Sequence, residues 1–307
     1  MRPLLLIANP SASGFTGAAL RTVEAKLGTA YAVTTAWPNG PAEARQAAAD
    51  AADDGYSVVA AMGGDGVVHH VANGLAFTGT ALGVIPTGTT NVVARILGIP
   101  MKAGKAAAAL VTGRARTMTL AHIATESSVA ARSEYAVFSL GMGLDADVVS
   151  IADRRPAAKY YFSSVNFAAI AVNQVVKRYR TRLPDMKVEC DGRVAHATTV
   201  LVQVHEMYTY WGRVPLRLTP EPGDGLTALA LERVTTPRAL GIAARGIARR
   251  QIAKQRGAHV FADLEKLLVH AEPSAQFQAD GELLGRAEDI EITPAYDALT
   301  VIAPHRG

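Results

Sequence analysis

The segment Met62-Gly63-Gly64-Asp65-Gly66-Val67 lies between an apolar run typical of a buried strand and a run typical of a helix. Glycines let the backbone turn tightly and approach a ligand closely, and a helix start presents unpaired N–H groups that suit phosphate. Asp65 would repel phosphate unless a divalent cation lies between them or the carboxylate receives a proton. The alternative is an ordinary strand-to-helix turn, and this segment alone does not decide between them.

Strand-like and helix-like runs alternate on both sides of this segment over residues 1–121. The pattern predicts a mostly parallel sheet covered by helices on both faces, a Rossmann-like α/β nucleotide-binding domain. The expected strands are 4–8, 31–35, 57–62 and 81–85, and the expected helices are 17–27, 42–54, 67–75, 92–97 and 103–111.

The pattern changes after residue 121, where strand-like runs are joined by turn signals. We predict a second domain over 122–307, an antiparallel β-sandwich with helices near 157–179 and 237–255, whose C-terminal tail is a candidate to return to the first domain. The expected strands are 122–124, 134–140, 186–190, 198–204, 216–218, 227–231 and 276–279.

Composition narrows the class of protein. Of the 307 residues, 49% are hydrophobic and 19% are charged, which is typical of a globular chain. The net charge of +4 is too small to indicate nucleic-acid binding, but it is compatible with an anionic ligand or membrane surface. Cys190 is the only cysteine, and no run approaches the roughly 20 apolar residues of a membrane span. We therefore expect a cytoplasmic protein that does not cross a membrane.

Two further loops carry polar residues after predicted strands. The run from Gly83 to Asn91 contains Pro86, Gly88 and several hydroxyl or amide side chains, and residues 9–14 follow the first strand. In a parallel sheet all three loops open at the carboxyl edge, where such folds bind ligands. A nucleotide site at this edge is the natural inference, although a threonine such as Thr89 also serves as an ordinary helix N-cap.

The order and spacing of these segments resemble the diacylglycerol kinase catalytic-domain family, which includes bacterial lipid kinases and sphingosine and ceramide kinases. The resemblance rests on Asn9-Pro10 with Ser13-Gly14, on Gly63–Gly66, on Ile85–Asn91 with Ala94-Arg95 and Leu97–Pro100, and on later blocks at Gly141–Ala146, Pro222–Leu226 and Asp280–Glu282. Each block alone is weak, but the combination extends over almost the whole chain.

This resemblance implies a kinase that binds ATP between two domains and phosphorylates a hydroxyl of a membrane lipid such as diacylglycerol. It implies two catalytic carboxylates, Glu282 and Asp65. Glu282 is the favoured general base, because Asp65 is better placed to face the ATP phosphates or their magnesium, but the sequence leaves Asp65 as the alternative base. It also implies Mg2+ bound by Asp224 with the backbone carbonyls of Glu221 and Leu226. The implied nucleotide-binding residues are Asn9, Thr35, Gly63, Gly64, Asp65, Gly66, Thr89 and Asn91.

The sequence departs from the family pattern at several positions. Val67 replaces a threonine after Gly-Gly-Asp-Gly, His69-His70 stand where asparagine and glutamate are frequent, and Val92 replaces an aspartate. The segment 205–212 replaces a glycine-rich stretch, so we expect it to shape the acceptor pocket. Adjacent helical side chains point in different directions, so the two histidines are poor partners for one metal ion. We expect one of them to be solvated and the other to lie at the edge of the cleft.

Two motifs have ordinary explanations. Gly141-x-Gly143-x-x-Ala146 matches a dinucleotide motif, but the strand–helix alternation has ended there, and Asp145 and Asp147 add negative charge. Asp191-Gly192 resembles Asp280-Gly281, but we interpret it as a hairpin turn between two strands.

Two basic stretches, at 177–182 and 245–256, bear on which partners the protein binds. The second also carries apolar residues, so it is a candidate for peripheral docking on the inner face of a membrane, although packing on its own core explains it as well. We expect a lipid at a membrane surface as partner, no nucleic acid and no stable protein partner, and the family is compatible with a homodimer. The alternatives are a kinase of a soluble acceptor, as in NAD kinases, and a nucleotide- or lipid-binding regulator without catalysis.

Overall fold

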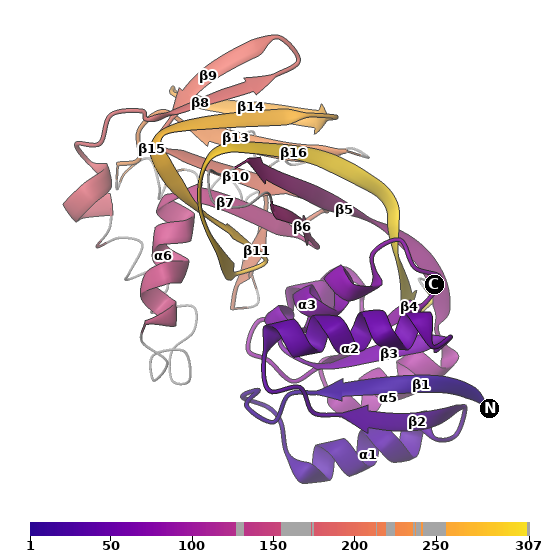
Figure 1. Ribbon diagram of the computed structural model, residues 1–307. Coiled ribbons are helices and arrows are strands. Elements are labelled where there is room, and N and C mark those ends of the chain that lie inside the picture. Colours follow the sequence, from indigo (N-terminus) through magenta and orange to yellow (C-terminus); the bar gives the residue numbers. More distant parts are fainter. Residues whose placement is uncertain are drawn as a thin grey trace. The chain divides into compact units, whose positions relative to one another are not determined.

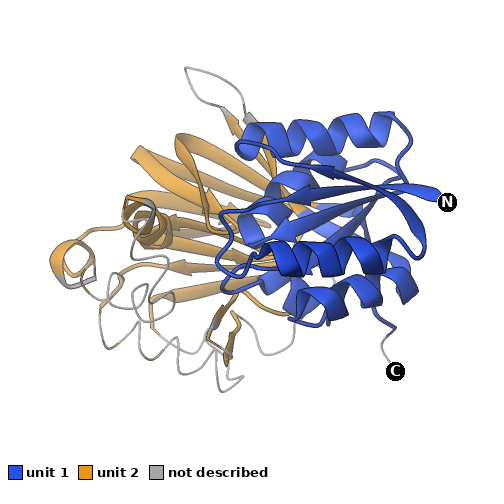
Figure 2. Cartoon of the chain, turned by 90° about the horizontal axis from the view of Figure 1, so that it is seen from below, with its two compact units in different colours: residues 1–120, 295–307 blue, residues 121–294 orange. Residues whose placement is uncertain are grey.

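The computed structural model describes residues 1–126, 132–154, 173, 175–212, 214–218, 225–235, 237, 241 and 256–305. The chain divides into two compact units: unit 1 comprises residues 1–120 and 295–307, and unit 2 comprises residues 121–294 (Figure 2). The predicted helices at 157–179 and 237–255 lie mostly outside the described residues, apart from a short π-helix at Val175–Tyr179.

Unit 1 is built on a parallel sheet with the strand order β4-β3-β1-β2 (Figure 1). Every residue of β3 and β4 is buried. Apolar runs without alternation are expected in a sheet that is covered on both faces. The four strands are β1 (Arg2–Ala8), β2 (Tyr31–Ala36), β3 (Val58–Gly63) and β4 (Ala81–Pro86).

Helices cover the two faces of this sheet in pairs: α2 packs on α3, and α1 packs on α5 (Figure 1). The α1 helix starts after Thr16, whose hydroxyl accepts the N–H of Ala19 at 3.0 Å. This is the expected role of a threonine N-cap. The helices are α1 (Gly17–Leu27), α2 (Pro41–Asp53), α3 (Asp65–Leu75), α4 (Val92–Ile96) and α5 (Ala103–Thr112).

The end of the chain adds a strand to unit 1. In β16 (Glu282–Ala303), Val301 pairs in parallel with Leu82 of β4. The N–H of Phe77 donates to the carbonyl of Ala298 at 2.6 Å. Residues 295–303 therefore extend the sheet beyond β4, although the sequence predicts no strand there.

Unit 2 consists mainly of antiparallel strands. β7 lies between β10 and β15, β13 lies between β10 and β14, and β15 also pairs with β8 and β16. The described strands are β5 (Arg114–Glu126), β6 (Arg132–Ala136), β7 (Ser139–Gly143), β8 (Met186–Cys190), β9 (Arg193–Ala197), β10 (Thr199–Gln203), β11 (Thr209–Trp211), β12 (Val214–Leu216), β13 (Leu226–Leu231), β14 (Ala258–Leu264) and β15 (Leu267–Ala279), and an α-helix, α6 (Leu144–Asp153), follows β7.

The strands of unit 2 enclose an apolar core to which nearly all of them contribute, from Ile123 of β5 to Ile292 of β16. A smaller cluster forms around Tyr179 and Tyr208. The predicted fold class, a parallel α/β part followed by an antiparallel strand-rich part, is confirmed. Among the described residues, no helix has the length and apolar character needed to cross a bilayer.

Two local predictions in unit 2 are wrong. The single strand expected over 134–140 is divided into β6 and β7, because the N–H groups of Val137 and Phe138 donate to the carboxylate of Asp280 instead of to a neighbouring strand. The α6 helix begins directly after Gly143, where the sequence analysis expected the strand–helix alternation to have ended.

Candidate functional site

Three loops come together at the carboxyl ends of β1, β3 and β4 in unit 1. We call residues 9–16 the first loop, residues 63–66 the second and residues 86–91 the third. The N–H of Gly14 donates to Thr87 O at 2.8 Å, and the N–H of Thr87 donates to Gly63 O at 2.9 Å. The third loop is thus bonded to both others, and the expected convergence of these loops is observed.

Asn9 shapes the first loop. Its N–H donates to Met62 O at 3.0 Å, and its side-chain Oδ1 accepts the N–H of Ser11 at 2.9 Å. An asparagine turn of this kind orders a short loop at low cost. The hydroxyls of Ser13 and Thr89 lie 3.3 Å apart, so a polar side-chain contact also joins the first and third loops.

The second and third loops touch backbone to backbone. A Cβ on Gly88 would collide with the Cα of Gly64, whereas a Cβ on Gly64 would lie 3.4 Å from the Cα of Gly88. Glycine at position 88 is therefore required by this close approach. The contact holds the third loop over the start of α3.

Asp65 is the first residue of α3, two residues earlier than the predicted start. The cap residue of this helix is Gly64, which has no side chain to accept hydrogen bonds from the first N–H groups of the helix. Asp65 Oδ1 accepts the N–H of Val93 at 3.2 Å, which ties the second loop to the first turn of α4. This structural role of Asp65 could not be predicted from its place in the glycine-rich motif.

Asn91 closes the third loop on itself. Its Nδ2 donates to Gly88 O at 2.7 Å, and its Oδ1 accepts the N–H of Gly88 at 3.0 Å. The residue is buried and has φ of 52°, in the left-handed region that asparagine tolerates better than most residues. Asn91 therefore holds the shape of the loop and leaves Thr89 exposed near its tip.

Thr35 lies apart from this arrangement. It is half-buried near the end of β2, and its hydroxyl donates to Glu24 Oε1 of α1 at 2.7 Å. In the described part of the chain no hydrogen bond joins it to the three loops. The structure brings together Asn9, Gly63, Gly64, Asp65, Gly66, Thr89 and Asn91, but not Thr35.

The departures from the family pattern have structural counterparts. A Cβ on Gly63 would lie 2.6 Å from Cγ2 of Val67, so the valine side chain covers this glycine. The buried hydroxyl of Thr87 has no hydrogen-bond partner among the described residues. His69 is fully buried and His70 half-buried, so the expectation of a solvated histidine is wrong, because α3 packs against both α2 and the sheet.

In unit 2, Glu282 is the half-buried first residue of β16. It follows a two-residue turn, Asp280-Gly281, with φ of 54° and 87°, and it pairs with Ala279 across that turn. The buried carboxylate of Asp280 accepts N–H groups at 2.7, 2.8 and 3.1 Å from Val137, Phe138 and Ser139, respectively. The turn before Glu282 is thus held by the carboxylate of Asp280, a role that the Asp280–Glu282 motif alone did not indicate.

The predicted metal ligands are largely outside the described residues. Glu221 and Asp224 lie there, and only Leu226, the buried first residue of β13, is described. Among the described residues, no three His, Cys, Asp or Glu side chains form a group that could hold a metal ion.

The Gly141–Ala146 motif has a different use from phosphate binding. A Cβ on Gly141 would collide with the carboxylate of Asp145, so the space that glycine opens is filled by an acidic group. Tyr208 and Gln278 both donate to Asp145 Oδ2, at 2.8 and 2.6 Å. Burial raises the pKa of Asp145, and the two hydrogen bonds oppose that shift. This supports the rejection of a dinucleotide site and reveals a buried network that composition did not indicate.

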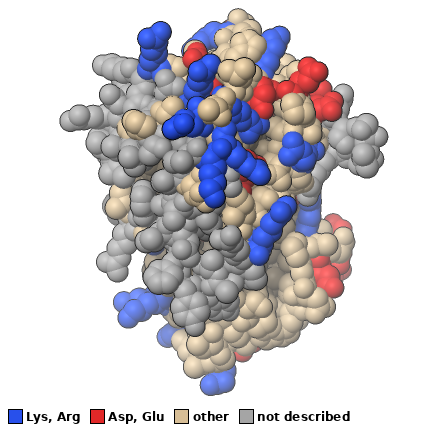
Figure 3. Space-filling model, turned by 90° about the vertical axis from the view of Figure 1, so that its left-hand side faces the viewer, with Lys and Arg blue, Asp and Glu red and all other residues tan. Residues whose placement is uncertain are grey.

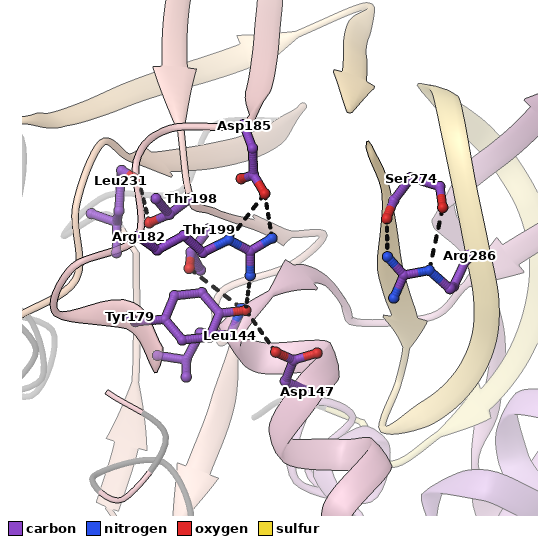
Figure 4. A network of polar contacts seen from close by, with 10 residues as sticks. All are labelled: Leu144, Asp147, Tyr179, Arg182, Asp185, Thr198, Thr199, Leu231, Ser274 and Arg286. Carbon is purple, nitrogen blue, oxygen red and sulfur yellow. Dashed lines mark hydrogen bonds and ion pairs between the residues drawn. The ribbon is translucent and has the colours of Figure 1, made fainter. Parts of the chain in front are cut away.

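A second network joins α6 to the segment before β8 (Figure 4). The hydroxyl of Tyr179 donates to Asp147 Oδ2 at 2.8 Å and accepts from Arg182 Nη1 at 2.7 Å. Arg182 Nε in turn donates to Asp185 Oδ2 at 3.0 Å. Burial, followed by the charge of Asp147, raises the pKa of Tyr179 well above its ordinary value. The tyrosine therefore stays a neutral hydrogen-bonding bridge.

Basic side chains remain exposed next to this network. Lys177, Arg178 and Arg180 are exposed, whereas Arg182 is engaged by Asp185. Lysine and arginine side chains gather over part of the surface in Figure 3. Of the second basic stretch, only Arg256 lies within the described residues.

Residues 3–123 match the family model of the diacylglycerol kinase catalytic domain. A diacylglycerol kinase of Bacillus subtilis (strain 168) is 43% identical over 84 residues, which are 26% of this chain and 28% of that protein. A diacylglycerol kinase of Mycobacterium tuberculosis (strain H37Rv) is 41% identical over 88 residues, 28% of each chain. These matches thus span little more than a quarter of the length of the relatives.

The likeness in fold extends further than the likeness in sequence. A crystal structure of a diacylglycerol kinase from Bacillus anthracis str. Sterne has a TM-score of 0.70 at 18% identity, covering 98% of this chain and 97% of that chain. Another solved chain from that organism has a TM-score of 0.76 at 20% identity, with 98% and 95% covered. At such identities the likeness shows the fold. Residues 3–123 of this chain are thus similar in sequence to the diacylglycerol kinase catalytic domain.

Proposed function

We propose that this protein is a lipid kinase that transfers the γ-phosphate of ATP to a hydroxyl of a membrane lipid such as diacylglycerol. The observation that carries the proposal is the cluster of three loops at the start of α3, within the segment that matches the family. Small residues, close backbone contact and a helix N-terminus suit a polyphosphate.

In this proposal the three loops of unit 1 hold ATP. The N–H groups at the start of α3 contact the phosphates, and Thr89 lies exposed where it can hydrogen-bond the nucleotide. Because one oxygen of Asp65 is bonded to Val93, its carboxylate is held in a defined orientation beside these N–H groups. This supports a role for Asp65 in facing the phosphates or the Mg2+ that accompanies them.

The chemical step is an in-line displacement. The lipid hydroxyl oxygen attacks the γ-phosphorus, the bond between that phosphorus and the β–γ bridging oxygen breaks, and ADP leaves. Glu282 of unit 2 takes the hydroxyl proton as general base, which requires it to reach the nucleotide held by unit 1. Asp224, with the carbonyls of Glu221 and Leu226, would supply hard oxygen ligands of the kind that Mg2+ prefers.

The test is a transfer assay with γ-labelled ATP, Mg2+ and total lipid extract, with the labelled product identified by mass. Glu282→Gln and Asp65→Asn each remove an ionised oxygen but keep the size of the side chain, so the label in the organic phase should fall by about 100-fold or more. Glu288→Gln, an exposed position on the same strand as Glu282, should leave transfer unchanged. Undiminished transfer in both site variants would refute the assigned site.

Nucleotide binding can be measured without transfer. Trp37 is 48% exposed, lies two residues after Thr35, and contacts Phe15 of the first loop edge to face at 6.0 Å between ring centroids. Because the chain has two tryptophans, Trp211→Phe leaves Trp37 as the single fluorescent indole. ATP should change its emission with a saturable dependence on concentration.

A second candidate function is nucleotide binding without catalysis, and the side chain of Val67 over Gly63 favours it, because a hydroxyl is missing there. Tight ATP binding with no transfer to any lipid would support this regulator. Transfer found only in the aqueous phase, after incubation with mixed lipids and NAD, would instead indicate a soluble acceptor.

A further inference from the structure

A buried carboxylate of unit 2 lies at the centre of a relay that ends one residue before Glu282. Asp145, in the first turn of α6, accepts hydrogen bonds from Tyr208 at 2.8 Å and from Gln278 Nε2 at 2.6 Å, both at Oδ2. Gln278 is buried on β15, and its Oε1 accepts the N–H of Gly281 at 2.8 Å. The relay thus runs from α6 through β15 to the turn that precedes Glu282.

The orientation of the Gln278 amide follows from its partners. A carboxylate can only accept, so the NH2 group must face Asp145, and the oxygen is then directed at Gly281. Reversing the amide would place its oxygen against a carboxylate oxygen and its NH2 group against a backbone N–H. Asp145 therefore determines which end of Gln278 meets the turn.

The turn is held from two sides. The carboxylate of Asp280 binds the backbone between β6 and β7, and Gln278 binds the N–H of Gly281. Both turn residues have positive φ, so the chain enters β16 in one defined direction. Glu282 is the next residue, and the position of its Cα is set by these bonds.

We propose that Asp145 and Gln278 are positioning residues that orient Glu282, and that Tyr208 couples the same carboxylate to the segment 205–212. The inference rests on the proposed function, in which Glu282 is the general base of phosphoryl transfer. It goes beyond that function by assigning a role to the Gly141–Ala146 motif. The absence of a side chain at Gly141 leaves room for the carboxylate of Asp145, which accepts the hydrogen bonds from Tyr208 and Gln278.

The cost of this arrangement supports a role beyond packing. A buried carboxylate loses its hydration, and apolar residues of similar volume would fill the same space at lower cost. Burial raises the pKa of Asp145 in spite of its two hydrogen bonds. A group that is expensive to bury and that fixes one amide beside Glu282 is consistent with positioning.

The first experiment compares Gln278→Ala with Gln276→Ala, a half-buried glutamine two residues earlier on β15. Gln278→Ala should lower kcat by about 10- to 100-fold, because small displacements of a catalytic group have effects of this size. KM for ATP should stay within about twofold, since unit 1 holds the nucleotide. Gln276→Ala should match wild type in both constants. A kcat of Gln278→Ala within about twofold of wild type would overturn the relay.

The second experiment compares two changes at Asp145. Asp145→Asn keeps an oxygen that can accept from Gln278, whereas Asp145→Ala removes the acceptor. The asparagine variant should retain at least about tenfold more kcat than the alanine variant at equal folded fraction, checked by circular dichroism. Equal kcat in the two variants would contradict the role of Asp145 in orienting Gln278.

A measurement that needs no activity separates this inference from the proposed function. Amide hydrogen exchange at Gly281 should be faster in Gln278→Ala than in wild type, while exchange in β3 should be unchanged. Unchanged exchange at Gly281 would overturn the relay even in an active kinase. Absence of transfer by the wild type, with altered exchange at Gly281 in the variant, would overturn the kinase and leave the relay standing.

Discussion

Two Asp-Gly turns in unit 2 have almost the same backbone and different surroundings. Asp191-Gly192 connects β8 and β9 with φ of 49° and 75°, and Asp280-Gly281 connects β15 and β16 with φ of 54° and 87°. Both are two-residue hairpin turns. From the sequence we interpret Asp191-Gly192 as a hairpin turn and Asp280-Gly281 as part of the site, but Asp280-Gly281 is a hairpin turn as well. The turn conformation does not distinguish them.

Burial and hydrogen bonding distinguish the two turns. Asp191 is exposed, and its carboxylate accepts only the weak donor Cys190 Sγ, at 3.3 Å, among the described residues. Asp280 is buried and accepts three backbone N–H groups. The local Asp-Gly sequence therefore specifies the turn conformation. Whether the aspartate also binds other parts of the chain depends on which backbone N–H groups the fold places next to it.

The largest effect is expected from removing the anchoring carboxylate. Asp280→Ala leaves three backbone N–H groups without their acceptor and should lower the free energy of unfolding by about 3 kcal/mol or more. Both variants place alanine at positive φ, which is unfavourable. Asp191→Ala has only this cost, so it should lower the free energy of unfolding by only about 1 kcal/mol. Urea unfolding followed by circular dichroism gives both values. Similar losses in the two variants would break the comparison.

A smaller and equal effect is expected at the glycines of the two turns. A Cβ on Gly192 or on Gly281 would meet nothing within 4 Å, so only the positive φ penalises a side chain. Gly192→Ala and Gly281→Ala should therefore each lower the free energy of unfolding by about 1–2 kcal/mol. The same urea titration checks this, and a loss at Gly281 several times larger would mean that the two backbones are not equivalent.

The smallest effect is a change in pH dependence next to the second turn only. The pKa of Asp145 is raised in the folded protein by burial, so the unfolded chain ionises at lower pH than the folded one. This group therefore lowers stability as pH rises from the unfolded pKa, near about 4, through the folded pKa. The melting temperature of Asp145→Asn minus that of wild type should therefore increase as pH rises from about 4 to about 8. A constant difference across that range would contradict a raised pKa.

Much of unit 1 could be predicted from the chain because its signals are local. The helix 17–27 was predicted at its observed bounds, and the buried strands appear as apolar runs bounded by glycine or proline. The loops that follow these strands must converge, because parallel strands place their carboxyl ends on one edge. Thr35 was the exception, since its hydroxyl could as well turn toward α1, where Glu24 accepts it.

Unit 2 was harder to predict because its decisive contacts join residues far apart in the chain. β16 contains Gly285, Pro294 and acidic residues, which are loop signals, yet it pairs with β15. The break between β6 and β7 depends on a carboxylate more than a hundred residues away. No periodicity in either segment could indicate that contact.

The sequence by itself determined the α/β part, the order of the glycine-bearing loops and the likeness of residues 3–123 to the diacylglycerol kinase catalytic domain, because these depend on short-range patterns. Only the tertiary structure decided that Asn91 and Asp65 also hold the loops, that Asp145 fills the space above Gly141, and that Asp280 anchors the turn before Glu282. The physical reason is that a buried polar group must find a partner wherever the fold supplies one, and that partner is not specified by its neighbours in the chain.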